Sequence, residues 1–163
     1  MTVTLDGRTV VQGNGAALTN PLIEMGLLSA RVMFNFLGIG LGKSGLLQEY
    51  GGYEGDVMLK HFVTPSGEYL KSIKPEEACD FLHRTWPKIS VVDFENAFKV
   101  TIAHANKAVA HLTVGPVREE DFDLKYRLAS DSIPPLIEEF LYAKLGVEAP
   151  LWHQKMRLVP LKK

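Results

Sequence analysis

The stretch Asp93–Thr113, DFENAFKVTIAHANKAVAHLT, decides the fold. Its apolar residues recur at i, i+3 and i+4, the spacing that places side chains on one face of an α-helix. We therefore predict a helix of about five turns, with Asp93 as its N-cap and Glu95 in its first turn. The residues of the predicted apolar face are Phe94, Ala97, Phe98, Thr101, Ile102, Ala105, Ala108, Val109 and Leu112.

Length and composition predict one globular domain around this helix. The chain has 163 residues, of which 46% are hydrophobic and 23% are charged, as is ordinary for a globular protein. Its net charge of −1 gives no overall basic excess of the kind that marks nucleic-acid binding, so such binding needs a local patch or an assembled dimer. The single cysteine, Cys79, excludes an intramolecular disulfide, and we expect it to be buried and inert.

Further helices are predicted on both sides of the central stretch, and strand signals are few. The class is therefore all-α, a bundle of four to five helices with long loops. We expect an extended arm over residues 1–18, in which a small hairpin around Asp6-Gly7 is one alternative, then the bundle over 19–146 and a tail over 147–163. The additional helices are expected at 20–37, 54–62, 75–86, 118–129 and 133–145.

Capping residues support two of these boundaries. Asn20 can cap the first helix with Pro21 in its first turn, and Gly38 ends that helix. Asp131 or Ser132 can cap the last helix, and Pro134 and Pro135 suit its first turn.

The window 21–41 is apolar over about the 20 residues that a membrane span requires. Glu24, Arg31 and Asn35 interrupt it, and charges in the middle of a span are costly. We therefore expect a buried helix of a cytoplasmic protein and no contact with a membrane.

The segment 38–55 is rich in glycine and predicts a mobile loop. Its Gly42-Lys43-Ser44 resembles the end of a phosphate-binding P-loop, but that motif needs a glycine at position 37, which is leucine here. We also find no metal-ligand spacing such as H-x-x-x-H or C-x-x-C, so neither a metal nor a cofactor is expected.

Three polar residues of the first helix, Glu24, Arg31 and Asn35, fall on one narrow stripe because they are separated by seven and four residues. One interpretation is that Glu24 and Arg31 satisfy each other or a neighbouring helix. The other is that Arg31 faces a cleft together with His104 or His111.

Two motifs on separate helices resemble a known family. They are E-x6-R-x3-N, from Glu24 through Arg31 to Asn35, and N-K-x-x-A-H-L-T over residues 106–113. In this order they resemble bacterial proteins related to the HEPN superfamily, named for higher-eukaryote and prokaryote nucleotide-binding domains. The resemblance covers residues 19–146.

The resemblance implies a helical bundle that forms a homodimer. Active members of the family are metal-independent ribonucleases with an R-x4-H pattern. His111 matches the histidine of that pattern, but Asn106 stands at the arginine position and is followed by Lys107. Asparagine cannot supply the charge that stabilises a phosphate.

Three functions stay open from the sequence. The first is a non-catalytic, degenerate HEPN-like domain that binds RNA, a nucleotide or a protein partner. The second is a metal-independent endoribonuclease, and the third is a purely structural or interaction role. The nuclease would use His111 with Arg31 and Lys107. The further candidate binding residues are Glu24, Asn35, His104 and Asn106.

Overall fold

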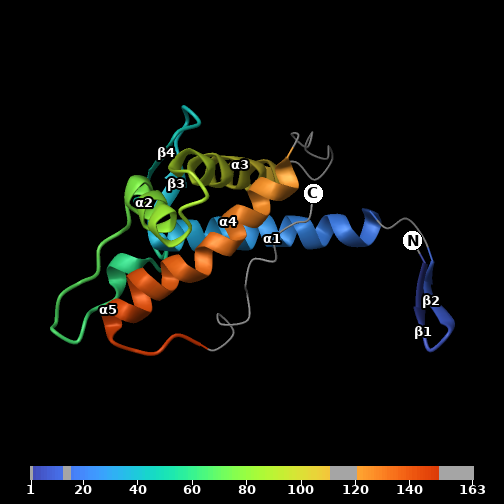
Figure 1. Ribbon diagram of the computed structural model, residues 1–163, viewed down its shortest axis with the longest axis horizontal. Coiled ribbons are helices and arrows are strands. Elements are labelled where there is room, and N and C mark those ends of the chain that lie inside the picture. Colours follow the sequence, from blue (N-terminus) through green and yellow to red (C-terminus); the bar gives the residue numbers. More distant parts are fainter. Residues whose placement is uncertain (1, 13–15, 111–120, 151–163) are drawn as a thin grey trace.

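The computed structural model describes residues 2–12, 16–110 and 121–150, and these are mostly helical (Figure 1). The helical-bundle prediction is therefore confirmed at this level. The helical elements are α1 (Ala16–Leu37), the 3₁₀ turn η1 (Leu59–His61), α2 (Pro75–Thr85), α3 (Val91–Ala110), α4 (Phe122–Ile137), the π-helical turn η2 (Glu138–Tyr142) and α5 (Ala143–Leu145).

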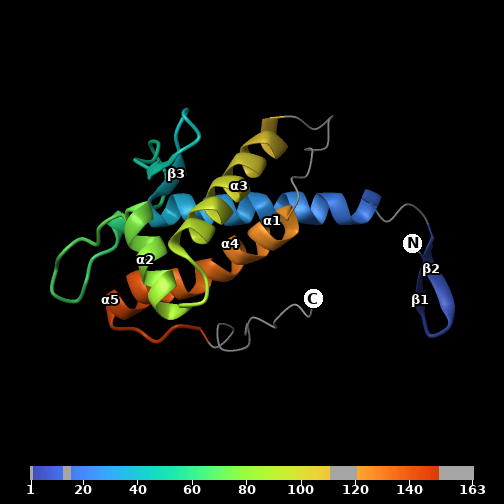
Figure 2. The ribbon, with the colours of Figure 1, turned by 45° about the horizontal axis from the view of Figure 1, so that its top comes forward.

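Helices α1, α3 and α4 each pack against the other two, and α2 covers α3 and α4 near the C-terminal end of α1 (Figures 1 and 2). The N-terminal part of α1 extends beyond α3 and α4 in both views. No helix in the described parts of the chain is both long and apolar enough to cross a membrane.

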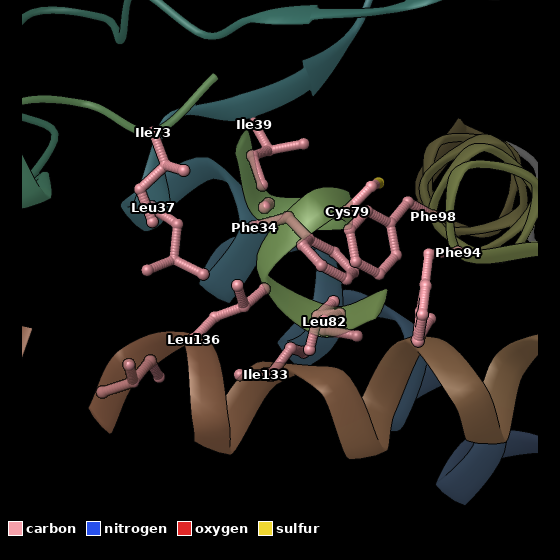
Figure 3. Packing of buried hydrophobic residues seen from close by; sticks show 14 of the residues in the cluster. Phe34, Leu37, Ile39, Ile73, Cys79, Leu82, Phe94, Phe98, Ile133 and Leu136 are labelled. Atoms are coloured by element: carbon pink, nitrogen blue, oxygen red, sulfur yellow. The ribbon is translucent and has the colours of Figure 1, made fainter. Parts of the chain in front are cut away.

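The main core lies where the four helices meet (Figure 3). Phe34 of α1 and Phe98 of α3 are fully buried, with ring centroids 4.5 Å apart. Cys79 of α2 is buried as predicted, and burial together with nearby acidic side chains raises the pKa of its thiol to about 12. The other labelled core residues are Leu37, Ile39, Ile73, Leu82, Phe94, Ile133 and Leu136.

Two small antiparallel hairpins accompany the helices. Strands β1 (Thr2–Leu5) and β2 (Arg8–Gln12) pair around Asp6-Gly7, as the hairpin alternative predicted. Strands β3 (Ile39–Leu41) and β4 (Leu47–Glu49) pair within the glycine-rich segment, where we expected only a loop. The apolar residues of β3 pack onto the core directly after α1, which holds this segment in place.

The predicted start of α3 was wrong by three residues. Its N-cap is Ser90, whose hydroxyl accepts a hydrogen bond from the Asp93 amide at 3.2 Å. The Asp93 carboxylate in turn accepts from the Ser90 amide and from its hydroxyl. This reciprocal capping box makes Asp93 the third helical residue and adds a turn before the predicted helix.

The first helix also begins earlier than predicted. Helix α1 starts at Ala16, so Asn20 is not its N-cap and Pro21 lies inside it. Proline lacks an N–H, so the helix forgoes one backbone hydrogen bond there. Gly38 ends α1 as predicted: its φ is +100°, and its amide donates to the Asn35 carbonyl at 3.0 Å.

The two helices predicted at 118–129 and 133–145 are one continuous path within the described residues, from α4 through η2 to α5. Ser132 does not cap a new helix, because its hydroxyl turns back to the Leu128 carbonyl at 2.7 Å. Pro134 and Pro135 therefore lie inside α4. Gly146, with a φ of +65°, ends the path as predicted.

The helix predicted at 54–62 was also wrong. Only the short turn η1 (Leu59–His61) is helical there, and the residues before it form an irregular loop. This loop passes beside the last turns of α1 and forms the site described next.

Candidate functional site

A pocket of about 470 Å³ lies between the C-terminal half of α1 and the loop that follows β4. Its size falls within the range of about 300–1,000 Å³ that is typical of small-molecule sites. We call it the Arg31 pocket. It is lined by Arg31, Val32, Asn35, Phe36, Tyr50, Tyr53, Asp56, Val57 and Met58.

One wall of the pocket is formed by α1, and helical spacing explains which residues of α1 line it. Arg31 and Asn35 are four residues apart, so they lie one above the other on the same face. The Arg31 guanidinium forms no hydrogen bond or ion pair with any residue that the structure describes, and Glu24 does not pair with it. The interpretation in which Glu24 and Arg31 satisfy each other is therefore wrong.

The loop wall is shaped around one carboxylate. Oδ2 of Asp56 accepts a hydrogen bond from the Tyr50 hydroxyl and another from the Tyr53 amide, each at 2.8 Å. The Asp56 amide donates back to the Tyr53 carbonyl at 3.1 Å, closing a turn over residues 53–56. Among the described residues Oδ1 of Asp56 has no hydrogen-bond donor, so it is open to a ligand.

Two glycines let the loop approach the end of α1. The Tyr50 amide donates to the Gly38 carbonyl at 2.7 Å, which fixes the start of the loop. A Cβ atom on Gly40 would lie only 3.2 Å from the Tyr50 Cβ atom. The absence of a side chain at Gly40 therefore allows Tyr50 to reach the pocket.

The charges of the pocket follow from these contacts. Burial, the hydrogen bond to Asp56 and the negative charge of Asp56 raise the pKa of Tyr50 to about 12, although Arg31 opposes the shift. The hydrogen bonds from the Tyr53 amide and the Tyr50 hydroxyl lower the pKa of Asp56. At neutral pH the pocket therefore holds a cation, Arg31, an anion, Asp56, and a neutral phenol, Tyr50.

An exposed aromatic ring stands at the pocket beside these charges. The Tyr53 side chain is 79% exposed, and its ring centroid lies 6.2 Å from that of Tyr50 in an edge-to-face arrangement. The hydrogen bond of the Tyr53 amide to Asp56 fixes the backbone of Tyr53 beside the pocket, and most of the side chain is accessible to a ligand.

The predicted site residues are only partly brought together. Arg31 and Asn35 line the pocket, whereas Glu24 lies two turns earlier on α1 and is not among the lining residues. His104 is only 3% exposed, and its ring packs 4.5 Å from that of Phe122. It lies beside a small cluster separate from the main core, so the expected shared cleft of Arg31 with His104 was wrong.

The remaining predicted residues lie at the C-terminal end of α3 or beyond it. Asn106 and Lys107 are exposed there and do not line the Arg31 pocket. His111 lies outside the described residues. Within the described ranges, no group of three histidine, cysteine, aspartate or glutamate side chains is placed to hold a metal ion.

The loop residues Tyr50, Tyr53 and Asp56 were missed from the sequence. A signal is present, because the stretch YGGYEGD places two tyrosines and an aspartate among three glycines, and functional residues are common on such loops. Nothing in the sequence indicates that this loop folds back onto Arg31.

The fold and the site thus define a class of protein: a mostly helical protein with a pocket lined by charged and aromatic side chains. Comparison of the chain with family models, with curated proteins and with solved structures finds no match in any of the three. The resemblance to HEPN proteins therefore stays a prediction.

Proposed function

We propose that the protein is a non-catalytic HEPN-like domain that binds a nucleotide unit in the Arg31 pocket. The unit is a free nucleotide or one residue of a single-stranded RNA, which present the same phosphate and base. The protein acts as a homodimer in this proposal, as the family resemblance implies. The observation that carries the proposal is that the Arg31 guanidinium, which has no hydrogen-bond or ion-pair partner among the described residues, lines the same pocket as Tyr53 and Asp56.

Arg31 supports the binding of a phosphate. A guanidinium offers up to five N–H donors in a planar fork that matches phosphate oxygens. This guanidinium has no protein partner among the described residues and is half-buried, so it is held in the pocket wall with its donors available. The Asn35 side chain, one turn further on, adds an amide that can donate to the same phosphate or to a ribose hydroxyl.

Tyr53 and Asp56 support the binding of a base. Stacking of a base on an aromatic side chain contributes about 1–3 kcal/mol. Oδ1 of Asp56 can accept a hydrogen bond from an exocyclic amino group, which adenine, cytosine and guanine carry and uracil lacks. The pocket therefore favours amino-bearing bases over uracil.

Binding is proposed rather than cleavage because none of the histidines that the structure describes lines the Arg31 pocket. Metal-independent RNA cleavage needs a group that moves the proton of the 2′-hydroxyl, most often a histidine near the phosphate. His104 is buried against Phe122 instead. Asn106, at the position of the family's arginine, agrees with a binding role.

Fluorescence anisotropy with a labelled single-stranded RNA, in competition with AMP and UMP, tests the proposal. We expect saturable binding that AMP displaces better than UMP. Arg31→Met should weaken binding about ten- to a hundredfold, the value of a charged hydrogen bond. Tyr53→Ala should weaken it by a similar factor through lost stacking.

Two matched variants serve as controls. Arg84→Met removes the same charge from an exposed position on α2, and Tyr69→Ala removes an exposed tyrosine that does not line the pocket. Both should leave binding unchanged. Equal weakening by Arg31→Met and Arg84→Met would mean that only general charge attraction is measured and would overturn the proposal.

A further inference from the structure

The loop wall of the Arg31 pocket carries a negative charge that no basic side chain among the described residues pairs with. Oδ2 of Asp56 accepts hydrogen bonds from two uncharged donors, the Tyr50 hydroxyl and the Tyr53 amide, and both contacts lower the pKa of the Asp56 carboxyl group. The next basic residue along the chain, Lys60, donates to a backbone carbonyl of the loop at 2.7 Å instead of to a carboxylate. Asp56 is therefore ionised at neutral pH, and no described residue forms an ion pair with it.

Two tyrosine rings lie beside this carboxylate. The Tyr50 hydroxyl is bonded to it, and the ring centroids of Tyr50 and Tyr53 are 6.2 Å apart in an edge-to-face arrangement. Most of the Tyr53 side chain is exposed, so a ligand can reach its ring. The face of an aromatic ring is negative and attracts cations. An ionised carboxylate next to an accessible tyrosine ring therefore favours a positively charged planar group over a neutral one.

Arg31 and Asp56 offer opposite charges from different walls of the pocket, and they do not pair with each other. The guanidinium matches a phosphate, as proposed above. A nucleotide with a neutral base supplies that phosphate but brings no positive charge to Asp56. A nucleotide with a positively charged base matches both walls.

We infer that the Arg31 pocket selects nucleotides whose base carries a fixed positive charge through methylation of a ring nitrogen, as in N3-methylcytosine and N1-methyladenine. The charged base lies on the Tyr53 ring, and its exocyclic amino group donates to Oδ1 of Asp56. The phosphate binds the Arg31 guanidinium. This inference rests on the proposed nucleotide binding and adds to it the charge of the base.

Methylation at these ring positions also makes the base available to a pocket. The methyl group occupies the Watson–Crick edge, so the base cannot form its ordinary pair. Proteins read RNA mainly at unpaired bases, which can turn out of the strand and stack on an aromatic side chain. A free nucleotide with the same base presents the same groups, and the experiment below distinguishes these two sources.

Isothermal titration calorimetry with 3-methyl-CMP and 5-methyl-CMP tests the charge preference. The two nucleotides are isomers with the same amino group and phosphate, but only the ring of 3-methyl-CMP is positively charged at neutral pH. We expect 3-methyl-CMP to bind with a Kd at least about tenfold lower, because it adds a cation–π contact and a charge-assisted hydrogen bond. A short single-stranded RNA with one N3-methylcytosine distinguishes the sources. Tighter binding than that of 3-methyl-CMP assigns the site to RNA, and equal or weaker binding assigns it to the free nucleotide.

Variants of the loop test the source of the preference. Asp56→Asn should bring the ratio of the two Kd values close to one, because asparagine keeps an acceptor oxygen but not the charge. Glu54→Gln, the matched control, removes a charge from an exposed neighbour that does not line the pocket, and it should leave the ratio unchanged. Tyr53→Leu should also lower the ratio, whereas Tyr53→Phe should keep it. Each ratio compares two ligands on one protein, so it does not depend on the folded fraction of a variant.

The outcomes separate this inference from nucleotide binding itself. Equal Kd values for the two nucleotides in the wild-type protein would overturn the inference and leave nucleotide binding intact. Absence of binding by either nucleotide would overturn both. A preference for 3-methyl-CMP that persists in Asp56→Asn, or that Glu54→Gln removes to the same extent, would show that it does not come from Asp56 and would also overturn the inference.

Discussion

The Tyr50 hydroxyl donates a 2.8 Å hydrogen bond to Oδ2 of Asp56, and this contact ties together the two ends of the loop that forms one wall of the Arg31 pocket. The same carboxylate oxygen also accepts from the Tyr53 amide. One aspartate therefore sets the position of both tyrosines. Removal of the Asp56 charge should therefore change the pKa of Tyr50 directly, and it should change ligand binding through the position of Tyr53.

The first prediction concerns the pKa of Tyr50 in Asp56→Asn. Burial, the hydrogen bond and the Asp56 charge raise this pKa to about 12 in the wild-type protein. Removal of the charge should lower it towards the ordinary value of about 10, while burial keeps part of the shift. Ultraviolet titration of tyrosine ionisation, with Tyr50→Phe to assign the signal, measures the change.

The sign of the linked stability effect is fixed by the raised pKa. The contribution of neutral Tyr50 to stability is fully present below its unfolded pKa, about 10, and is lost as pH rises through about 12. Between about pH 10 and pH 12, the free energy of unfolding should therefore fall more for the wild-type protein than for Tyr50→Phe. A pKa of Tyr50 that does not change in Asp56→Asn would contradict the hydrogen bond.

The second prediction concerns the glycine that ends α1. Gly38 has a φ of +100°, and a Cβ atom there would lie 2.5 Å from the Cβ atom of Ser72. Gly38→Ala should lower the free energy of unfolding by at least about 2 kcal/mol through strain and overlap. Urea denaturation measures the loss.

Gly45→Ala is the matched control for that substitution. Gly45 has a φ of +77°, but no atom lies within 4 Å of its added Cβ atom. Gly45→Ala should therefore lower the free energy of unfolding by about 1 kcal/mol, through backbone strain alone. Equal losses for the two variants would show that the contact of Gly38 with Ser72 does not matter.

The third prediction concerns the centre of the core. Phe34 is fully buried against Phe98, so Phe34→Ala should lower the free energy of unfolding by about 3–5 kcal/mol. Leu46→Ala, at an exposed position in the β3–β4 hairpin, should cost well under about 1 kcal/mol. Thermal or urea denaturation distinguishes them, and a small effect of Phe34→Ala would argue against the packing of α1 on α3.

The fourth prediction separates binding from cleavage. A mixed RNA pool incubated with the wild-type protein in EDTA should stay intact, and His111→Ala should behave identically. Gel analysis of the pool measures the result. Cleavage that disappears in His111→Ala, with the fold of that variant confirmed, would favour the ribonuclease alternative instead.

Much of the fold could be predicted because the sequence pattern of each helix is local. The apolar periodicity of residues 94–105 and the proline and glutamates at the start of α2 predict their helices without tertiary information. The boundary errors have physical causes. Ser90 rather than Asp93 caps α3. The Ser132 hydroxyl bonds back to a carbonyl of α4 instead of capping a new helix. In both places the sequence offers two polar residues that could serve as a helix N-cap.

Only the α1 side of the site could be predicted from the sequence. The stripe of Arg31 and Asn35 is a helical feature, and its spacing indicates a shared face. The opposite wall depends on how β3–β4 and its following loop fold back over α1, which is a long-range arrangement. Glycine-rich segments allow many conformations, so the approach of Tyr50 to Gly38 and Gly40 could not be read from the residues.

A nuclear magnetic resonance titration of the ¹⁵N-labelled protein with AMP tests nucleotide binding in the Arg31 pocket most directly. We expect saturable shifts of the Arg31 side-chain Nε–H signal and of the backbone amides of residues 51–57. These shifts should be lost in Arg31→Met and kept in Arg84→Met. A titration without saturable shifts at these positions, or with shifts only elsewhere in the chain, would contradict nucleotide binding in the Arg31 pocket.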